Sequence, residues 1–196
     1  MSVQARDVIV IGTSAGGVEA LQSIVRGFPA DFPASVFVVM HVAPRSRSIL
    51  PEILTASGPL PAVHPLDGEA IKPGRIYVAP PDEHLIIEPG HVHLSFGPKE
   101  RLQRPCINVS FRSAALAYGE RVAGAVLTGQ LDDGAAGLWD IKRRGGIAIV
   151  QNPEEAAFPS MPLSALRDIE VDYTVRLSEI APLLVRLCTQ PKLETV

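Results

Sequence analysis

The chain has 196 residues, of which 46% are hydrophobic and 20% charged, and its formal net charge is −3. This length suits one domain with a large core, so we expect a single domain over residues 1–196 with its core between about 7 and 188. The near-neutral charge argues against a nucleic-acid partner, and no apolar run is long enough for membrane insertion.

Cysteine content and the first residues indicate where the protein works. The two cysteines, Cys106 and Cys188, are far apart and show no metal-ligand spacing. They therefore indicate neither a disulfide framework nor a zinc site. Residues 1–7 are too short and too polar for a secretory signal. We expect an unprocessed, cytoplasmic protein.

The first predicted unit is a strand, a glycine-rich turn and a helix. Four β-branched residues over 8–11 run into the turn at 12–17, and a helical pattern follows over 18–25. The spacing Gly12-x-Ser14-x-Gly16 fits a nucleophile elbow, in which glycines allow a sharp bend that exposes a serine hydroxyl. The same turn would also suit a phosphate-binding loop, or Ser14 would simply cap the helix. The turn alone leaves these alternatives open.

Apolar runs alternate with helical patterns along most of the chain. Runs without polar alternation indicate parallel strands that are buried on both faces by helices. Further strands are predicted over 35–40, 75–78, 122–127, 147–150 and 173–175. Further helices are predicted from about 48–50 to 57, over 109–118 with Asn108 as N-cap, over 135–143, over 156–168 as one broken helix, and over 179–188. Residues 191–196 are expected to fray.

The middle third is rich in Pro and Gly turns. Strands over 85–88 and 91–95, joined by Pro89-Gly90, predict a hairpin that extends the edge of the sheet. The alternation of strands and helices predicts an α/β fold. Its expected form is a three-layer doubly wound sandwich with a mostly parallel sheet and an antiparallel edge hairpin.

Polar side chains follow three of the predicted strands. Ser14 follows the first strand, His41 follows the second, and Asp132 and Asp133 follow the strand that ends at Leu127. Ligands bind beyond the carboxyl ends of such strands. A serine hydroxyl becomes a good nucleophile when a neutral imidazole takes its proton and a carboxylate orients that imidazole. The pattern therefore favours a Ser-His-Asp hydrolase.

Simpler interpretations exist for several of these residues. His41 follows an apolar run, so a buried histidine bonded to a carbonyl group is an alternative. Of the two aspartates, one is predicted to orient His41 and the other to cap the next helix. His91 and His93 share one face of a strand, but without a third ligand they are interpreted as exposed edge residues rather than a metal site.

Arginines flank the loops at the predicted active edge. Most are interpreted as solvated surface charge, although a rim of arginines would suit an acidic polypeptide substrate. Arg104 is the one predicted to bind substrate. The set comprises Arg45, Arg47, Arg101, Arg104 and Arg112.

Several motifs, taken in order, resemble the catalytic domain of the chemotaxis protein-glutamate methylesterases, the CheB family. The resemblance extends from about Val8 to Leu187. The motifs are Gly12-Thr13-Ser14-Ala15-Gly16-Gly17, His41-Val42-Ala43-Pro44, Asp67-Gly68, Tyr77-Val78-Ala79-Pro80-Pro81-Asp82-x-His84-Leu85, Arg104-Pro105-Cys106-Ile107-Asn108-Val109, Leu127-Thr128-Gly129-x-x-Asp132-Asp133-Gly134-Ala135-Ala136-Gly137 and Met161-Pro162.

The resemblance implies hydrolysis of glutamate γ-methyl esters on the cytoplasmic helices of methylated chemoreceptors, with release of methanol. Deamidation of certain receptor glutamines is implied as a related activity. By position, Ser14 is the nucleophile, His41 the base and Asp133 the orienting acid. The backbone N–H groups of Ala15 and Gln130 match positions expected to bind the oxyanion. No metal or cofactor is implied.

Three departures from the family pattern stand out. Ala15 occupies a position where members often have a threonine, whose hydroxyl assists the oxyanion. Gln130-Leu131-Asp132 replaces Met-Gly-Asn, so a different cleft shape is expected. The catalytic strand begins at about Asp7, which leaves no room for the usual N-terminal receiver domain, so a stand-alone domain with a separate regulatory protein is expected. A nucleotide- or phosphate-binding module and a non-catalytic receptor-docking protein stay as alternative functions.

Overall fold

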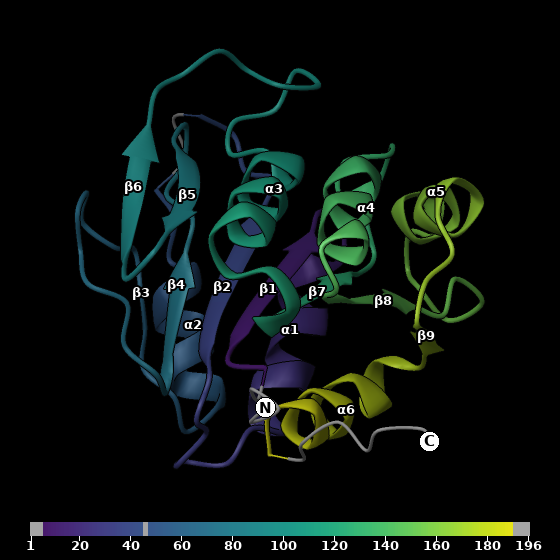
Figure 1. Cartoon of the computed structure of the whole chain (residues 1–196), viewed down its shortest axis with the longest axis horizontal. Helices are drawn as coiled ribbons and strands as arrows, with labels where there is room; N and C mark the ends of the chain where they lie inside the picture. The colour runs from purple at the N-terminus through teal and green to yellow at the C-terminus, as the bar shows by residue number, and fades with distance from the viewer. Residues whose placement is uncertain (1–5, 45–46, 190–196) are drawn as a thin grey trace.

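The computed structural model describes residues 6–44 and 47–189 as a parallel sheet between two layers of helices, with a small second sheet at one side (Figure 1). Arg45 and the predicted frayed end at 191–196 lie outside the described residues. The strands are β1 (Val8–Thr13), β2 (Ser35–Met40), β3 (Ala62–Val63), β4 (Arg75–Val78), β5 (His84–Glu88), β6 (His91–Ser95), β7 (Val122–Val126), β8 (Ile147–Gln151) and β9 (Tyr173–Val175). The helices are α1 (Gly17–Arg26), α2 (Leu50–Ser57), α3 (Ile107–Tyr118), η1 (Gly119–Arg121), α4 (Ala135–Arg143), α5 (Ser160–Asp168) and α6 (Leu177–Thr189).

The main sheet has seven strands in the order β3-β4-β2-β1-β7-β8-β9, and every neighbouring pair is parallel. The chain moves outward from β1 to β2 and β4, then returns to β7 on the other side of β1. Because α1 and α4 leave these two adjacent strands for opposite faces of the sheet, the switch point lies between β1 and β7. The predicted doubly wound α/β class is confirmed.

Successive side chains of β1 enter two different cores. Ile9 and Ile11 belong to the core shared with α1, α2 and α6, whereas Val8 and Val10 belong to the core shared with α3, α4 and α5. Side chains alternate between the faces of a strand, so a strand covered on both sides needs apolar residues at every position. This requirement explains the unbroken apolar runs in the sequence.

The predicted antiparallel hairpin is present, but it forms a sheet of its own rather than extending the main sheet. It packs on α3, where the Ser110 hydroxyl donates to the Leu85 carbonyl at 2.6 Å and the Ile87 N–H donates to the Ser113 hydroxyl at 2.9 Å. The main sheet ends instead at the two-residue strand β3, which the sequence patterns do not predict.

Two helix starts differ from the predictions. The N-cap of α3 is Cys106, so the assignment of that cap to Asn108 is wrong. Asn108 lies in the first turn, where its side-chain carbonyl accepts the N–H groups of Gly134 and Gly137 at 3.1 and 2.7 Å. The broken helix over 156–168 is helical only from Ser160 onward. Over the described ranges, no helix is both long and apolar enough to cross a membrane.

Candidate active site

The carboxyl ends of β1, β2 and β7 fix the backbone of the candidate site. Thr13, the last residue of β1, is in register with Met40, the last residue of β2. One residue further on, the His41 N–H donates to the Thr13 carbonyl at 3.3 Å, and the Ser14 N–H donates to the Thr128 carbonyl at 3.1 Å. Ser14 and His41 are therefore held directly beyond the strands, next to the switch point.

The structure brings Ser14, His41 and Asp133 together. His41 Nδ1 lies 3.2 Å from Ser14 Oγ, and His41 Nε2 lies 2.8 Å from Asp133 Oδ2. When Nε2 carries the ring proton and donates it to the carboxylate, the lone pair of Nδ1 faces the serine hydroxyl. His41 thus bonds a carboxylate rather than a backbone carbonyl group. Ser14 does not cap α1, because the N-cap is Gly16 at φ 75° and forms no side-chain cap bond.

Asp133 is 2% exposed and accepts four hydrogen bonds. His41 Nε2 and the Ile107 N–H bind Oδ2 at 2.8 and 2.7 Å, while the Asn108 N–H and the Cys106 thiol bind Oδ1 at 3.0 and 3.3 Å. Burial by itself would raise the pKa of Asp133, but the bonds from His41, Ile107 and Asn108 hold that pKa below its ordinary value. The carboxylate is therefore charged at neutral pH and orients the imidazole.

Asp132, the neighbouring aspartate, has a different environment. Its side chain is 40% exposed and pairs with Arg101. The N-cap of α4 is Gly134, at φ 104°, and no aspartate side chain caps this helix. The prediction that one of the two aspartates caps α4 is therefore wrong.

Ala15 and Gln130, whose backbone N–H groups are predicted to bind the oxyanion, lie in the turns after β1 and β7. Ala15 follows Ser14 in the turn, and Gly129 packs so closely on Ser14 that a Cβ at Gly129 would lie 3.0 Å from the Ser14 Cβ. Within the described ranges, neither N–H group has a hydrogen-bond acceptor. Each N–H group is therefore free to donate, as the predicted role of binding an oxyanion would require.

Comparisons with known proteins point to one family. The family model for the CheB methylesterase matches residues 9–184. The chain belongs to the CheB methylesterase family.

Individual relatives agree with this membership. A Leptospira interrogans protein, provisionally named a protein-glutamate methylesterase/protein-glutamine glutaminase, is 39% identical over 92% of this chain and 94% of its own length. A Methanosarcina mazei protein-glutamate methylesterase/protein-glutamine glutaminase is 36% identical over 93% of this chain, which spans 52% of that protein. The crystal structure of the Thermotoga maritima CheB methylesterase catalytic domain has a TM-score of 0.88 and 32% identity, and the match covers 92% of this chain and 98% of that one.

Thr128 is a site residue that the sequence patterns did not single out. Its carbonyl accepts the Thr13 hydroxyl as well as the Ser14 N–H, and its own N–H donates to Gln151 Oε1 at 2.9 Å. Its hydroxyl donates to the Ala15 carbonyl at 3.0 Å. These bonds join residues that are far apart in the sequence, so no local pattern predicts them. The one sequence feature that could have pointed to Thr128 is its place in the CheB-like motif that follows β7.

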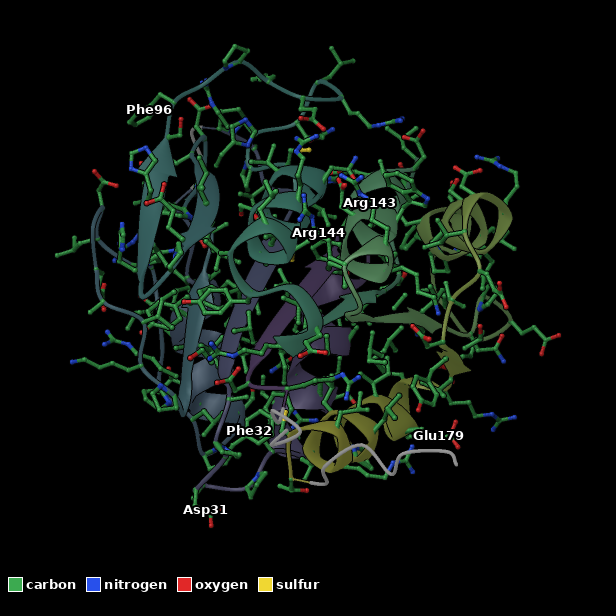
Figure 2. All side chains as sticks on the ribbon, viewed as in Figure 1. Asp31, Phe32, Phe96, Arg143, Arg144 and Glu179 are labelled. Atoms are coloured by element: carbon green, nitrogen blue, oxygen red, sulfur yellow. The ribbon has the colours of Figure 1, made fainter. Side chains whose placement is uncertain are left out.

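Three arginines of the predicted rim form ion pairs with acidic side chains. Arg101 pairs with Asp132, Arg112 with Glu100, and Arg104 with Asp82. Arg104 also donates to the carbonyl groups of Phe96 and Gly97, both at 2.9 Å. Figure 2 shows Phe96 just beyond β6, where its ring centroid lies 5.9 Å from the Arg104 guanidinium carbon. Arg104 thus ties the loop before α3 to the hairpin.

The two histidines of β6 have carboxylate partners. His91 pairs with Glu88 at 2.8 Å, and His93 pairs with Asp67 at 2.7 Å. Across residues 6–44 and 47–189, no group of three or more His, Cys, Asp or Glu side chains is arranged to hold a metal ion.

The loop that departs from the familiar CheB motif retains a glycine-like backbone. Leu131 occupies the position of the motif glycine at φ 68°, and its side chain is 65% exposed. Its carbonyl accepts the Ser160 hydroxyl at 3.1 Å. A left-handed conformation is costly for a leucine, so this loop keeps its shape at some cost in stability.

Proposed function

We propose that this chain is a cytoplasmic serine hydrolase that removes methyl groups from glutamate γ-methyl esters on chemoreceptor helices and also deamidates receptor glutamines. The observation that carries the proposal is the alignment of Ser14 Oγ, the two nitrogens of His41 and the Asp133 carboxylate. The names of the Leptospira and Methanosarcina relatives support both the ester and the amide substrate.

The proposed reaction begins with attack on the ester. Ser14 Oγ bonds to the carbonyl carbon while its proton moves to His41 Nδ1, and the carbonyl electrons move onto oxygen. The Ala15 and Gln130 N–H groups bind this oxyanion. When the oxyanion collapses, the bond to the methoxy group breaks, and His41 returns the proton to give methanol. Asp133 stabilises the imidazolium that exists between these two steps.

Water completes the cycle. His41 takes a proton from water as the water oxygen attacks the glutamyl ester on Ser14, and it then returns the proton to Ser14 Oγ. The product is a glutamate carboxylate. A glutamine substrate would follow the same route with ammonia in place of methanol. The steps use nucleophilic attack and proton transfer by side chains, and none needs a cofactor.

Two further parts of the proposal concern the catalytic unit and substrate recognition. We propose residues 1–196 as one catalytic unit. The contact between Arg104 and the substrate stays a prediction. In the free chain, Arg104 forms four hydrogen bonds, to Asp82, Phe96 and Gly97, and these bonds support the loop before α3. That loop leads to Cys106 and the donors of Asp133.

Methanol release from a methylated chemoreceptor tests the proposal. The wild-type chain is expected to release methanol, and Ser14→Ala is expected to release none above background. A fluorophosphonate should label Ser14 in the wild type but not in His41→Ala, because labelling needs an activated hydroxyl. Absence of both methanol and adduct with a correctly folded wild type would favour a binding module or a docking protein instead.

A further inference from the structure

We propose that Cys106 is a positioning residue whose thiol donates to Asp133 and thereby sets how tightly Asp133 holds the proton on His41. This inference rests on the proposed function, because it assigns a second layer to the same Ser-His-Asp site. The family resemblance assigns no role to this thiol.

The geometry supports a specific contact. Cys106 Sγ lies 3.3 Å from Asp133 Oδ1, and the residues are 0% and 2% exposed. Oδ1 has one other donor, the Asn108 N–H at 3.0 Å, whereas Oδ2 receives His41 and the Ile107 N–H. Loss of the thiol would therefore leave one carboxylate oxygen with half of its donors and without access to bulk water.

The thiol acts only as a donor over the working range of pH. Burial, reinforced by the charge of Asp133, raises the pKa of Cys106 to about 12. It therefore stays protonated wherever the hydrolase operates, and its own titration adds no step to a pH profile.

Other titratable groups around the pair are already engaged. His84 Nδ1 accepts the Cys106 N–H at 3.2 Å, and its Nε2 bonds the Pro98 carbonyl at 3.0 Å. Glu100 acts on Cys106 electrostatically but is paired with Arg112. On the other side of Asp133, His41 is the ionisable partner in contact with the carboxylate.

The direction of the effect follows from charge. A donor at Oδ1 stabilises the carboxylate and weakens its hold on the His41 imidazolium. Without that donor, His41 keeps its proton to a higher pH. Because catalysis needs neutral His41, the acid limb of kcat/KM is then expected at higher pH.

The test is an NMR titration of the His41 ring nitrogens in the wild type, Cys106→Ala and Cys106→Ser. Cys188 provides the matched control, because it is also buried with a pKa raised to about 12, but lies on α6 and has no bond to Asp133. Cys106→Ala is expected to raise the midpoint by about half a pH unit, while Cys106→Ser, which keeps a donor, and Cys188→Ala stay within about 0.2 unit of the wild type.

A Cys106→Ala midpoint equal to that of the wild type would overturn the inference and leave Cys106 as a packing residue. Should Cys106→Ala fail to fold, the S–H stretching band decides. Cys106, measured in Cys188→Ser, is expected at lower frequency than Cys188, measured in Cys106→Ser, because only the former donates to a carboxylate. Equal frequencies would contradict the contact.

These measurements use no substrate. A wild type that releases no methanol would refute the proposed function, yet the titration would still report whether the thiol controls His41. Failure of the titration with normal methanol release would refute the inference alone. The acid limb of kcat/KM for methylated receptor should follow the same order as the NMR midpoints.

Discussion

The turns after β1 and β7 have similar backbones, but their polar side chains differ in burial and in the number of hydrogen bonds. Each leads to a helix whose N-cap is a glycine in the left-handed conformation, Gly16 at φ 75° and Gly134 at φ 104°. After β1, Ser14 is partly exposed and has one side-chain partner at 3.2 Å. After β7, Asp133 is buried and has four donors.

This difference fits the roles proposed for the two groups, Ser14 as nucleophile and Asp133 as orienting carboxylate. A nucleophile has to reach its substrate, so it cannot be enclosed or saturated with hydrogen bonds. An orienting carboxylate has to remain charged and fixed, so burial among donors serves it well. The comparison predicts that changes at Ser14 affect chemistry alone, whereas changes at Asp133 affect both chemistry and the fold.

The largest effect on kcat is expected for substitutions of Ser14 and His41. Ser14→Ala, His41→Ala and the double variant should each lower kcat by about 10⁴-fold or more, because members of a triad act as one unit. Thermal unfolding of all three should stay close to the wild type. Single-variant losses that multiply in the double variant would show that the two residues act independently.

Asp133→Asn is expected to have the next largest effect. We expect kcat to fall by about 10³-fold, less than for Ser14→Ala, because the amide no longer favours the correct His41 tautomer. Stability should fall by about 1–3 kcal/mol, since N–H donors of α3 lose a charged acceptor. Urea unfolding and methanol release measure the two losses.

The adjacent variant Asp132→Asn is the control for that measurement. It removes only an exposed pair with Arg101, so its cost should be within about 1 kcal/mol of zero and its kcat near that of the wild type. If Asp132→Asn were the more damaging change, the assignment of roles within the pair would be reversed.

Lowering the pH should remove the contribution of Asp133 to the free energy of unfolding. Because the pKa of Asp133 in the folded state lies below the ordinary value of 3.8, its contribution to stability is present above pH 3.8 and is lost as pH falls through the lower value. Urea unfolding between pH 5 and pH 2 should therefore show a shallower decline for Asp133→Asn than for the wild type. Parallel curves would mean that the carboxylate titrates alike in both states.

The smallest effect concerns Leu131, within the turn after β7. Leu131→Gly should raise the free energy of unfolding by about 0.5–1 kcal/mol, because glycine adopts φ 68° without strain. Leu131→Ala keeps the strain and is the matched control, expected at or below the wild type. A destabilised glycine variant would mean that the leucine side chain packs more than its exposure suggests.

The strands of the main sheet were predictable where burial on both faces requires an unbroken apolar run, as at Ser35–Met40. The strand Ala62–Val63 is too short to leave such a pattern. The hairpin was predictable from Pro89-Gly90 and its alternation, but not its packing on α3, since sequence spacing does not show which element a face meets.

At the site, sequence placed Ser14, His41 and Asp133 at one edge of the sheet, while the surroundings of Asp133 needed coordinates. Asn108 has the residue type of an N-cap, yet the N–H groups of Ile107 and Asn108 bond a carboxylate about 25 residues further along the chain. A buried carboxylate needs hydrogen-bond donors, and it takes them from whichever groups the fold brings close. Local sequence propensity cannot predict a bond to a residue that is distant in the chain.

The carboxylate that orients His41 also serves the first turn of α3. A descendant that abandoned hydrolysis would still gain stability from the bonds between this aspartate and α3, whereas the same bonds would do nothing to preserve the alcohol or the imidazole. In a homologue whose activity is untested, an aspartate at this position is therefore poor evidence of an active enzyme. The presence of both the serine and the histidine, at the positions of Ser14 and His41, is the informative marker.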